Sequence, residues 1–209
     1  MTPIVLSDLE LDALTELVNL GVSNAALGLR EMVREEIVLT VPRVQIITRD
    51  AAVADLSERE AKRLVGVHQD FEGDITGRAL VIFPELKSIE LVRAVVGRDL
   101  SLDEIFELEQ EALAETGNIL LNGCLSTIAN LLGRTLRISL PEVIYGEALD
   151  FFTASSTTMD DRILFIYINF AVRERDLQGY IAMFLDMPSL ATLQQLVGEF
   201  IERTTSVSR

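Results

Sequence analysis

Two long segments of the chain, residues 8–32 and 102–132, carry apolar side chains at the spacing of an amphipathic helix. In the first segment this apolar stripe consists of Leu14, Val18, Val22, Ala25, Leu29 and Met32. At the start of each segment a serine is followed three residues later by a glutamate, as in a helical capping box. These pairs are Ser7 with Glu10 and Ser101 with Glu104. The pattern predicts two long helices, each with one face in a core.

The features that follow each helix recur in the same order in the two halves of the chain. Each helix leads into a strand-like run and a proline, IVLTV-Pro in the first half and LRISL-Pro in the second. Further on, a glycine opens an apolar strand that enters a second helix, in residues 77–97 and again in 179–198. Matching positions lie 99 residues apart in the long helices and 102 residues apart at these glycines. The sequence therefore predicts an internal repeat with halves of about 1–99 and 100–209.

The turns between the later strands predict the fold class. They are short, GDITG in the first half and RERDLQG in the second, which favours antiparallel pairing. An antiparallel sheet with helices packed on it is an α+β fold. We expect a single compact unit whose two halves pack about a pseudo-twofold axis. Residues 50–64 are charged, and residues 147–161 are rich in serine and threonine with exposed-looking aromatics, so both are interpreted as loops.

Composition narrows the classes of partner. Hydrophobic residues make up 49% of the 209 positions and charged residues 24%, which is typical of a globular protein. The net charge of -15 argues against nucleic acid and against anionic membrane surfaces, because both attract Lys/Arg patches. The N-terminus lacks a basic region before an apolar stretch, and the apolar run 163–172 is too short to span a membrane. We therefore expect a cytoplasmic protein without membrane insertion.

The single cysteine and the single histidine exclude several kinds of site. Cys124 cannot form an internal disulfide, and it lies in an apolar helical stretch, so it is interpreted as a core residue. His68 alone cannot provide a two-histidine metal site. A Ser-His-Asp or Cys-His arrangement would need His68, and no GxSxG motif is present. Both residues are expected to be structural.

Each long helix also carries a narrow polar stripe. In the first helix its members, spaced four, three and four residues apart, are Asp12, Glu16, Asn19 and Ser23. The positions 99 residues later are Glu111, Glu115, Asn118 and Asn122. A glutamate and an asparagine on a helix surface are most often only a solvated face, and a lone Glu-x-x-Asn is unspecific. Asparagine is a mediocre helix former, however, so the pair recurring at the same helical phase indicates a functional site.

These residues complete a longer motif in both halves. The chain resembles the CheC phosphatases of bacterial chemotaxis, whose motif is D/S-x3-E-x2-N-x22-P in each half. The first copy reads Asp12, Glu16, Asn19 and Pro42, and the second reads Glu111, Glu115, Asn118 and Pro141. Glu111 departs from the Asp or Ser of the family pattern, so the first site is expected to be the stronger. The resemblance extends through length and repeat structure over the whole chain.

The resemblance implies hydrolysis of the aspartyl phosphate on a CheY-like receiver in two-component signalling. The receiver would supply the phosphorylated aspartate, a lysine and Mg²⁺, so the chain needs no cofactor of its own. An asparagine amide can donate and accept hydrogen bonds and so hold the attacking water in line, and phosphoryl transfer depends on such positioning. The glutamate would pair with a cation of the receiver. Glu16, Asn19, Glu115 and Asn118 are the implied catalytic residues, and their side chains are expected to be solvent-accessible.

Two other interpretations stay open at the level of sequence. The repeat could be a noncatalytic adaptor or scaffold that binds a receiver or a CheD-like deamidase, and a dephosphorylation assay distinguishes this from catalysis. A metal-dependent hydrolase could use the carboxylates Asp12, Glu16, Glu111 and Glu115, since hard metals accept oxygen ligands alone. The sequence gives no distance between the two helices, which this second interpretation needs.

Overall fold

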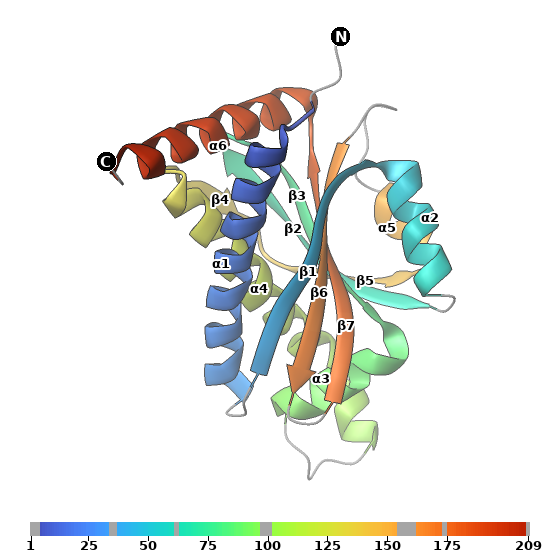
Figure 1. Cartoon of the computed structure of the whole chain (residues 1–209). Coiled ribbons are helices and arrows are strands. Elements are labelled where there is room, and N and C mark those ends of the chain that lie inside the picture. Colours follow the sequence, from blue (N-terminus) through green and yellow to red (C-terminus); the bar gives the residue numbers. More distant parts are fainter. Residues whose placement is uncertain are drawn as a thin grey trace.

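One antiparallel sheet of seven strands forms the centre of the described part of the chain (Figure 1). The structure is a computed structural model that describes residues 5–33, 37–60, 63–96, 102–153, 162–172 and 175–207. Its helices are α1 (Asp8–Val33), α2 (Arg49–Arg59), α3 (Glu85–Val96), α4 (Leu102–Leu131), α5 (Ala148–Thr153) and α6 (Met187–Val207). Its strands are β1 (Ile37–Thr48), β2 (Leu64–Gly73), β3 (Gly77–Pro84), β4 (Leu136–Ile138), β5 (Glu142–Gly146), β6 (Arg162–Val172) and β7 (Arg175–Leu185). The predicted α+β class and the two long helices are confirmed.

The order of the strands shows how the two halves of the repeat interlock. The order is β1-β6-β7-β3-β2-β4, and β5 also pairs with β2. The hairpins β2-β3 and β6-β7 meet at the centre, where Gly77 pairs with Leu185 and Ile82 pairs with Tyr180. The strand that follows each long helix crosses over: β1 pairs with β6 of the second half, and β4 and β5 pair with β2 of the first. Each half thus completes the sheet of the other half.

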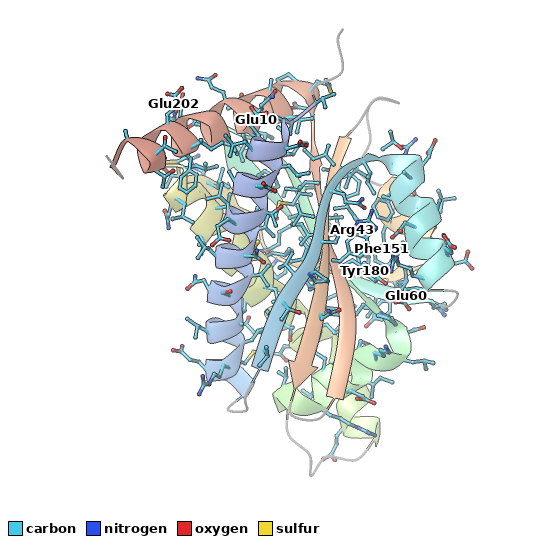
Figure 2. All side chains as sticks on the ribbon, viewed as in Figure 1. Glu10, Arg43, Glu60, Phe151, Tyr180 and Glu202 are labelled. Carbon is cyan, nitrogen blue, oxygen red and sulfur yellow. The ribbon has the colours of Figure 1, made fainter. Side chains whose placement is uncertain are left out.

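Alternation along the strands gives the sheet two buried faces. In β3, Ala79, Val81 and Phe83 face one core, while Leu80 and Ile82 face the other. The first core lies under α1, α3, α4 and α6, and the second lies under α2 and α5 (Figure 1). Figure 2 shows Phe151 and Tyr180 within the second of these layers. Because both faces are covered, the central strands are almost entirely apolar.

The two segments interpreted as loops contain helices, so that interpretation was wrong. Residues 50–64 include most of α2, whose first turn is capped by Thr48. Residues 147–161 include α5, and its Phe151 and Phe152 are buried rather than exposed. The ring of Phe152 lies 5.5 Å from that of Phe184, centroid to centroid. Packing on the apolar second face of the sheet stabilises these helices despite the polar composition of the segments. Residues 61–62 and 154–161 lie outside the described residues.

The last helix is longer than the repeat predicts. The expected strand-helix segment 179–198 stops at Gly198, but α6 continues through it to Val207. The residues beyond it, Phe200 and Ile201, pack against the first core, and this packing offsets the poor helix propensity of glycine. The matching Gly97 lies outside the described residues. Among the described helices, none is both long and apolar enough to cross a membrane.

Candidate functional site

The candidate residues lie on α1 and α4, which pack directly against each other (Figure 1). A Cβ atom added to Gly21 would lie 2.9 Å from the carbonyl oxygen of Cys124, so the two backbones approach closely. A Cβ atom added to Gly28 would lie 2.9 Å from the Cγ2 atom of Ile119. Contacting residue numbers therefore rise along α1 as they fall along α4, and the helices run antiparallel. The two Glu-x-x-Asn pairs lie on opposite sides of this crossing, on the order of 15 Å apart along the axes.

Local contacts fix the start of α1. The Ser7 backbone N–H donates to Glu10 Oε2 at 2.7 Å, and the Glu10 N–H donates to Ser7 Oγ at 3.3 Å, which confirms the first capping box. Gln194 of α6 also donates to Glu10 Oε1, at 3.2 Å, and so ties the start of α1, where Figure 2 labels Glu10, to the helix beside it. The second predicted box depends on Ser101, which lies outside the described residues.

The exposure of the four candidate residues follows their positions on the polar stripes. Glu16 and Glu115 are exposed, and Asn19 and Asn118 are half-buried. The expected accessibility is therefore confirmed for the carboxylates and is partial for the asparagines. No hydrogen bond or ion pair within the described residues engages the side chain of Glu16 or Glu115. Both carboxylates are thus available to a cation on another protein.

Asn118 belongs to a polar network beneath α4. Its Oδ1 atom accepts a hydrogen bond from Gln69 Nε2 at 3.0 Å and another from Asn122 Nδ2. Gln69 Nε2 also donates to the backbone carbonyl of Ser139 at 2.7 Å. Ser139 is held in turn, because its N–H donates to the Asp70 carbonyl and its Oγ accepts from the Asp70 N–H, both at 2.9 Å. The carboxamide of Asn118 is therefore fixed with its oxygen pointing into the protein.

Asn19 has no such network. No hydrogen bond to its side chain occurs among the described residues. The position that matches Gln69 is Ile166: Gln69 pairs with Ala79, and Ile166 pairs with Ile181, 102 residues after Ala79. Both ends of the Asn19 carboxamide remain free to bond a water or a partner.

Gln69 was not among the residues expected from the sequence, although its position carries a signal. Its neighbours on the same face of β2, Val67 and Phe71, are buried in the first core. Gln69 itself has an exposed fraction of 0%. A fully buried amide on an otherwise apolar face is uncommon, and it must hydrogen-bond to be tolerated. On this face of β2 the apolar residues alternate regularly, and the pattern is interrupted only by Gln69. This interruption is the signal in the sequence.

Cys124 and His68 take structural positions, as expected. Cys124 lies completely buried where α1 and α4 cross, and burial raises the pKa of its thiol to about 12. His68 Nε2 lies 3.3 Å from a carboxylate oxygen of Glu142. Burial lowers the pKa of His68, and the positive charge of Arg78 lowers it further. Neither residue contacts a Glu-x-x-Asn pair through any hydrogen bond of the described chain.

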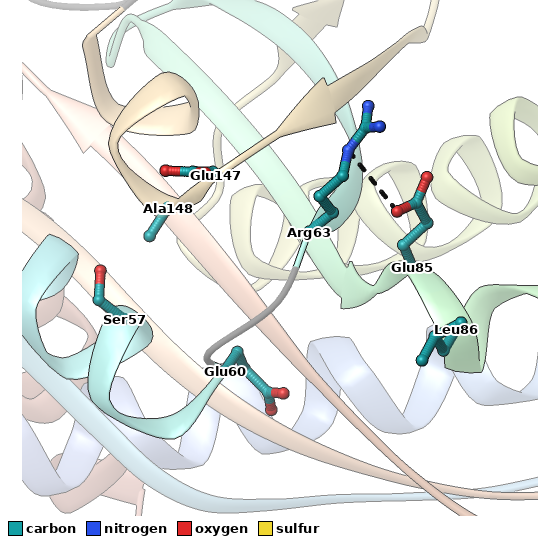
Figure 3. Close-up of a pocket in the computed structure, with 7 residues that line it drawn as sticks. All are labelled: Ser57, Glu60, Arg63, Glu85, Leu86, Glu147 and Ala148. Atoms are coloured by element: carbon teal, nitrogen blue, oxygen red, sulfur yellow. Dashed lines mark ion pairs between the residues drawn. The ribbon is translucent and has the colours of Figure 1, made fainter.

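A hollow of about 540 Å³ lies elsewhere on the surface (Figure 3). Glu60, Glu85 and Glu147 line it, and Arg63, which also lines it, pairs with Glu85 at 3.7 Å. None of the four candidate residues lines this pocket. Within the described residues, no group of three His, Cys, Asp or Glu side chains could hold a metal ion. The Glu-x-x-Asn pairs therefore lie on the helical surface, away from this hollow.

Comparison with known proteins finds relatives of this chain among curated phosphatases. No protein-family model matches the chain. The chain is 28% identical over 148 residues to the CheY-P phosphatase CheC of Bacillus subtilis, covering 69% of this chain and 68% of that protein. It is 27% identical over 141 residues to the putative CheY-P phosphatase CheC1 of Halobacterium salinarum, covering 67% of this chain and 71% of that protein. The chain is thus similar to CheC-type phosphatases over about two thirds of its length.

Solved structures of FliY and CheX share the fold of this chain. FliY of Thermotoga maritima matches with a TM-score of 0.76 at 18% identity, covering 94% of this chain and 100% of that one. CheX in the CheX–CheY–BeF3–Mg²⁺ complex of Borrelia burgdorferi matches with a TM-score of 0.52 at 16% identity. That match covers 79% of this chain and 96% of the other. At these identities the likeness establishes the fold of the CheC/CheX/FliY family and no more.

Proposed function

We propose that this chain accelerates hydrolysis of the aspartyl phosphate on a CheY-like response regulator in chemotaxis signalling. The observation that carries the proposal is the repeated pair: Glu16 with Asn19, and Glu115 with Asn118, on accessible stripes of two crossing helices. The sequence relative of Bacillus subtilis, a CheY-P phosphatase, supports the same activity. An open surface suits a substrate that is itself a folded protein, because the reacting phosphate lies in the partner's own site.

The two residue types divide the work between docking and water positioning. The unpaired carboxylate of Glu16 would bind a cation of the receiver, and a charge-assisted hydrogen bond of this kind gives both affinity and orientation. Asn19 would then accept a hydrogen bond from the attacking water and hold it in line with the phosphorus atom. We expect the receiver to supply Mg²⁺, because phosphoryl transfer uses the cation at the phosphorylated site itself. Both residues lie on one rigid helix, which fixes their separation.

The noncatalytic alternative predicts a different outcome of the same measurement. An adaptor would bind the phosphorylated receiver and leave its phosphate lifetime unchanged. Binding of a CheD-like deamidase stays a hypothesis that needs its own binding assay. The predicted cytoplasmic location also stays a hypothesis.

The test follows release of phosphate from a receiver labelled at its aspartate, with and without the chain. We expect faster release with the chain, and a weaker apparent affinity in the Glu16→Gln variant. Glu31→Gln is the matched control, since Glu31 is also an exposed glutamate of α1 and lies outside the motif. Unchanged phosphate release at saturating chain would contradict the proposal and favour the adaptor.

A further inference from the structure

The two sites of the chain differ in how their asparagines are held. We propose that Gln69 is a positioning residue that latches the Asn118 carboxamide with its oxygen turned inward, so that the second site turns over more slowly than the first. The inference rests on the proposed function, in which the asparagine oxygen accepts a hydrogen bond from the attacking water. Gln69, a residue outside the repeated motif, is then the cause of the difference in turnover between the two sites.

A backbone carbonyl fixes the orientation of the Gln69 amide, and Gln69 in turn fixes the orientation of the Asn118 amide. The backbone carbonyl of Ser139 can only accept, so the amide that bonds it at 2.7 Å must present its Nε2 atom. The same Nε2 atom of Gln69 then faces Asn118 at 3.0 Å and requires an acceptor there, which is Oδ1. Asn122 adds a second donor to that oxygen. If Asn118 turned its amide over, its NH2 group would face the NH2 group of Gln69, which the Ser139 carbonyl holds in place.

The latch uses up the atom that the reaction needs. An amide oxygen has two lone pairs, and Gln69 and Asn122 fill both of them. Asn118 therefore presents its NH2 group outward, which can donate to a phosphate oxygen but cannot accept a hydrogen bond from the attacking water. To work as proposed for Asn19, Asn118 must first break one of these bonds. One net hydrogen bond corresponds to roughly tenfold in rate.

Gln69 is also a poor choice if its only role is to stabilise the fold. Its side chain is completely buried, and its Oε1 atom has no hydrogen-bond partner within the described residues. An unsatisfied buried carbonyl opposes folding, whereas a leucine of similar size would avoid that cost. A role in orienting the Asn118 carboxamide explains why this position is a glutamine.

The helix backbone comes close enough for this contact at a glycine. Gly117 packs on Val67 of β2 without a side chain of its own, which places the next residue, Asn118, beside Gln69. The matching position of α1 is Val18, and Ile166 replaces Gln69 there. The first half therefore has neither the close approach nor the donor, and its asparagine stays free.

The test measures the second site alone, in the Asn19→Ala background. There we expect Gln69→Leu to raise kcat for phosphate release about tenfold, the effect of removing one net hydrogen bond. KM should change little, because Glu115 is untouched. Gln194→Leu in the same background is the control, since it also removes an amide that hydrogen-bonds between two elements, away from both asparagines. If Gln69→Leu does not fold, Gln69→Met keeps the unbranched shape and removes the donor.

A second readout needs no activity at all. NMR relaxation of the side-chain NH2 groups should show Asn118 rigid and Asn19 mobile on the ps–ns timescale, and Gln69→Leu should loosen Asn118. A mobile Asn118 in the unmodified chain, or a kcat that Gln69→Leu leaves unchanged or lowers, would overturn the latch. If the unmodified chain did not accelerate phosphate release, the proposed function would fail, whatever the NMR result.

Discussion

Gly123 tests whether α1 and α4 cross as closely as the site requires. A methyl group in the Gly123→Ala variant would lie 2.8 Å from the Ala25 Cα atom and 3.0 Å from its Cβ atom. Carbon atoms prefer separations of about 3.5–4.0 Å, so the helices must move apart. Such overpacking costs about 1–3 kcal/mol, and the better helix propensity of alanine offsets about 1 kcal/mol. We expect a net loss of stability of about 1 kcal/mol.

Gly198→Ala is the matched control for that variant. Gly198 also lies inside a helix, but an added Cβ atom would meet no heavy atom within 4 Å. This variant should gain up to about 1 kcal/mol from propensity alone. The difference between the two variants therefore isolates the steric cost. Urea unfolding followed by circular dichroism measures both midpoints, provided that the slope m is unchanged. Equal stabilisation of both variants would refute the close crossing.

Three further predictions concern stability. Ser7→Ala removes the reciprocal cap with Glu10 and should cost about 1 kcal/mol in urea unfolding, whereas an unchanged midpoint would mean that the cap is not formed. Leu14→Ala empties a site with an exposed fraction of 0% and should cost about 2–5 kcal/mol; a loss below 1 kcal/mol would contradict this burial. Burial lowers the pKa of His68 below 6.5, so the unfolded chain takes up the proton first as the pH falls. The free energy of unfolding should therefore decrease as the pH falls from 6.5, and His68→Gln should flatten this slope; an equal slope in both proteins would exclude His68 as its source.

Local patterns predicted the parts of the fold that local forces determine. The periodicity and the Ser7 cap predicted α1, and the short turns predicted the antiparallel central hairpins. The second turn is shorter than expected, because β7 begins at Arg175, within the expected turn 173–179. The crossing-over of β1 to β6 could not be predicted, because pairing between distant strands leaves no periodic signal in either. The helix α5 could not be predicted either, because its phenylalanines are buried by contact with strands that are distant in the sequence.

In the candidate site, too, local spacing predicted some features, and contacts between distant segments determined others. The repeated spacing predicted accessible side chains for Glu16 and Asn19; Glu16 is exposed, and Asn19 is half-buried. It could not show that the matching Asn118 is bonded from below, since Gln69 lies 49 residues away in another element. Equal motifs can therefore stand in unequal surroundings, and only the packing of α4 on β2 reveals the difference.

The rate of phosphate release from a phosphorylated CheY-like receiver is the most direct test of the account. It should be measured with the unmodified chain, with Asn19→Ala, with Asn118→Ala and with both changes together. We expect the chain to accelerate release, Asn19→Ala to lose more of that acceleration than Asn118→Ala, and the folded double variant to approach the receiver's own slow rate. A double variant that releases phosphate as fast as the unmodified chain would contradict the assignment of these asparagines.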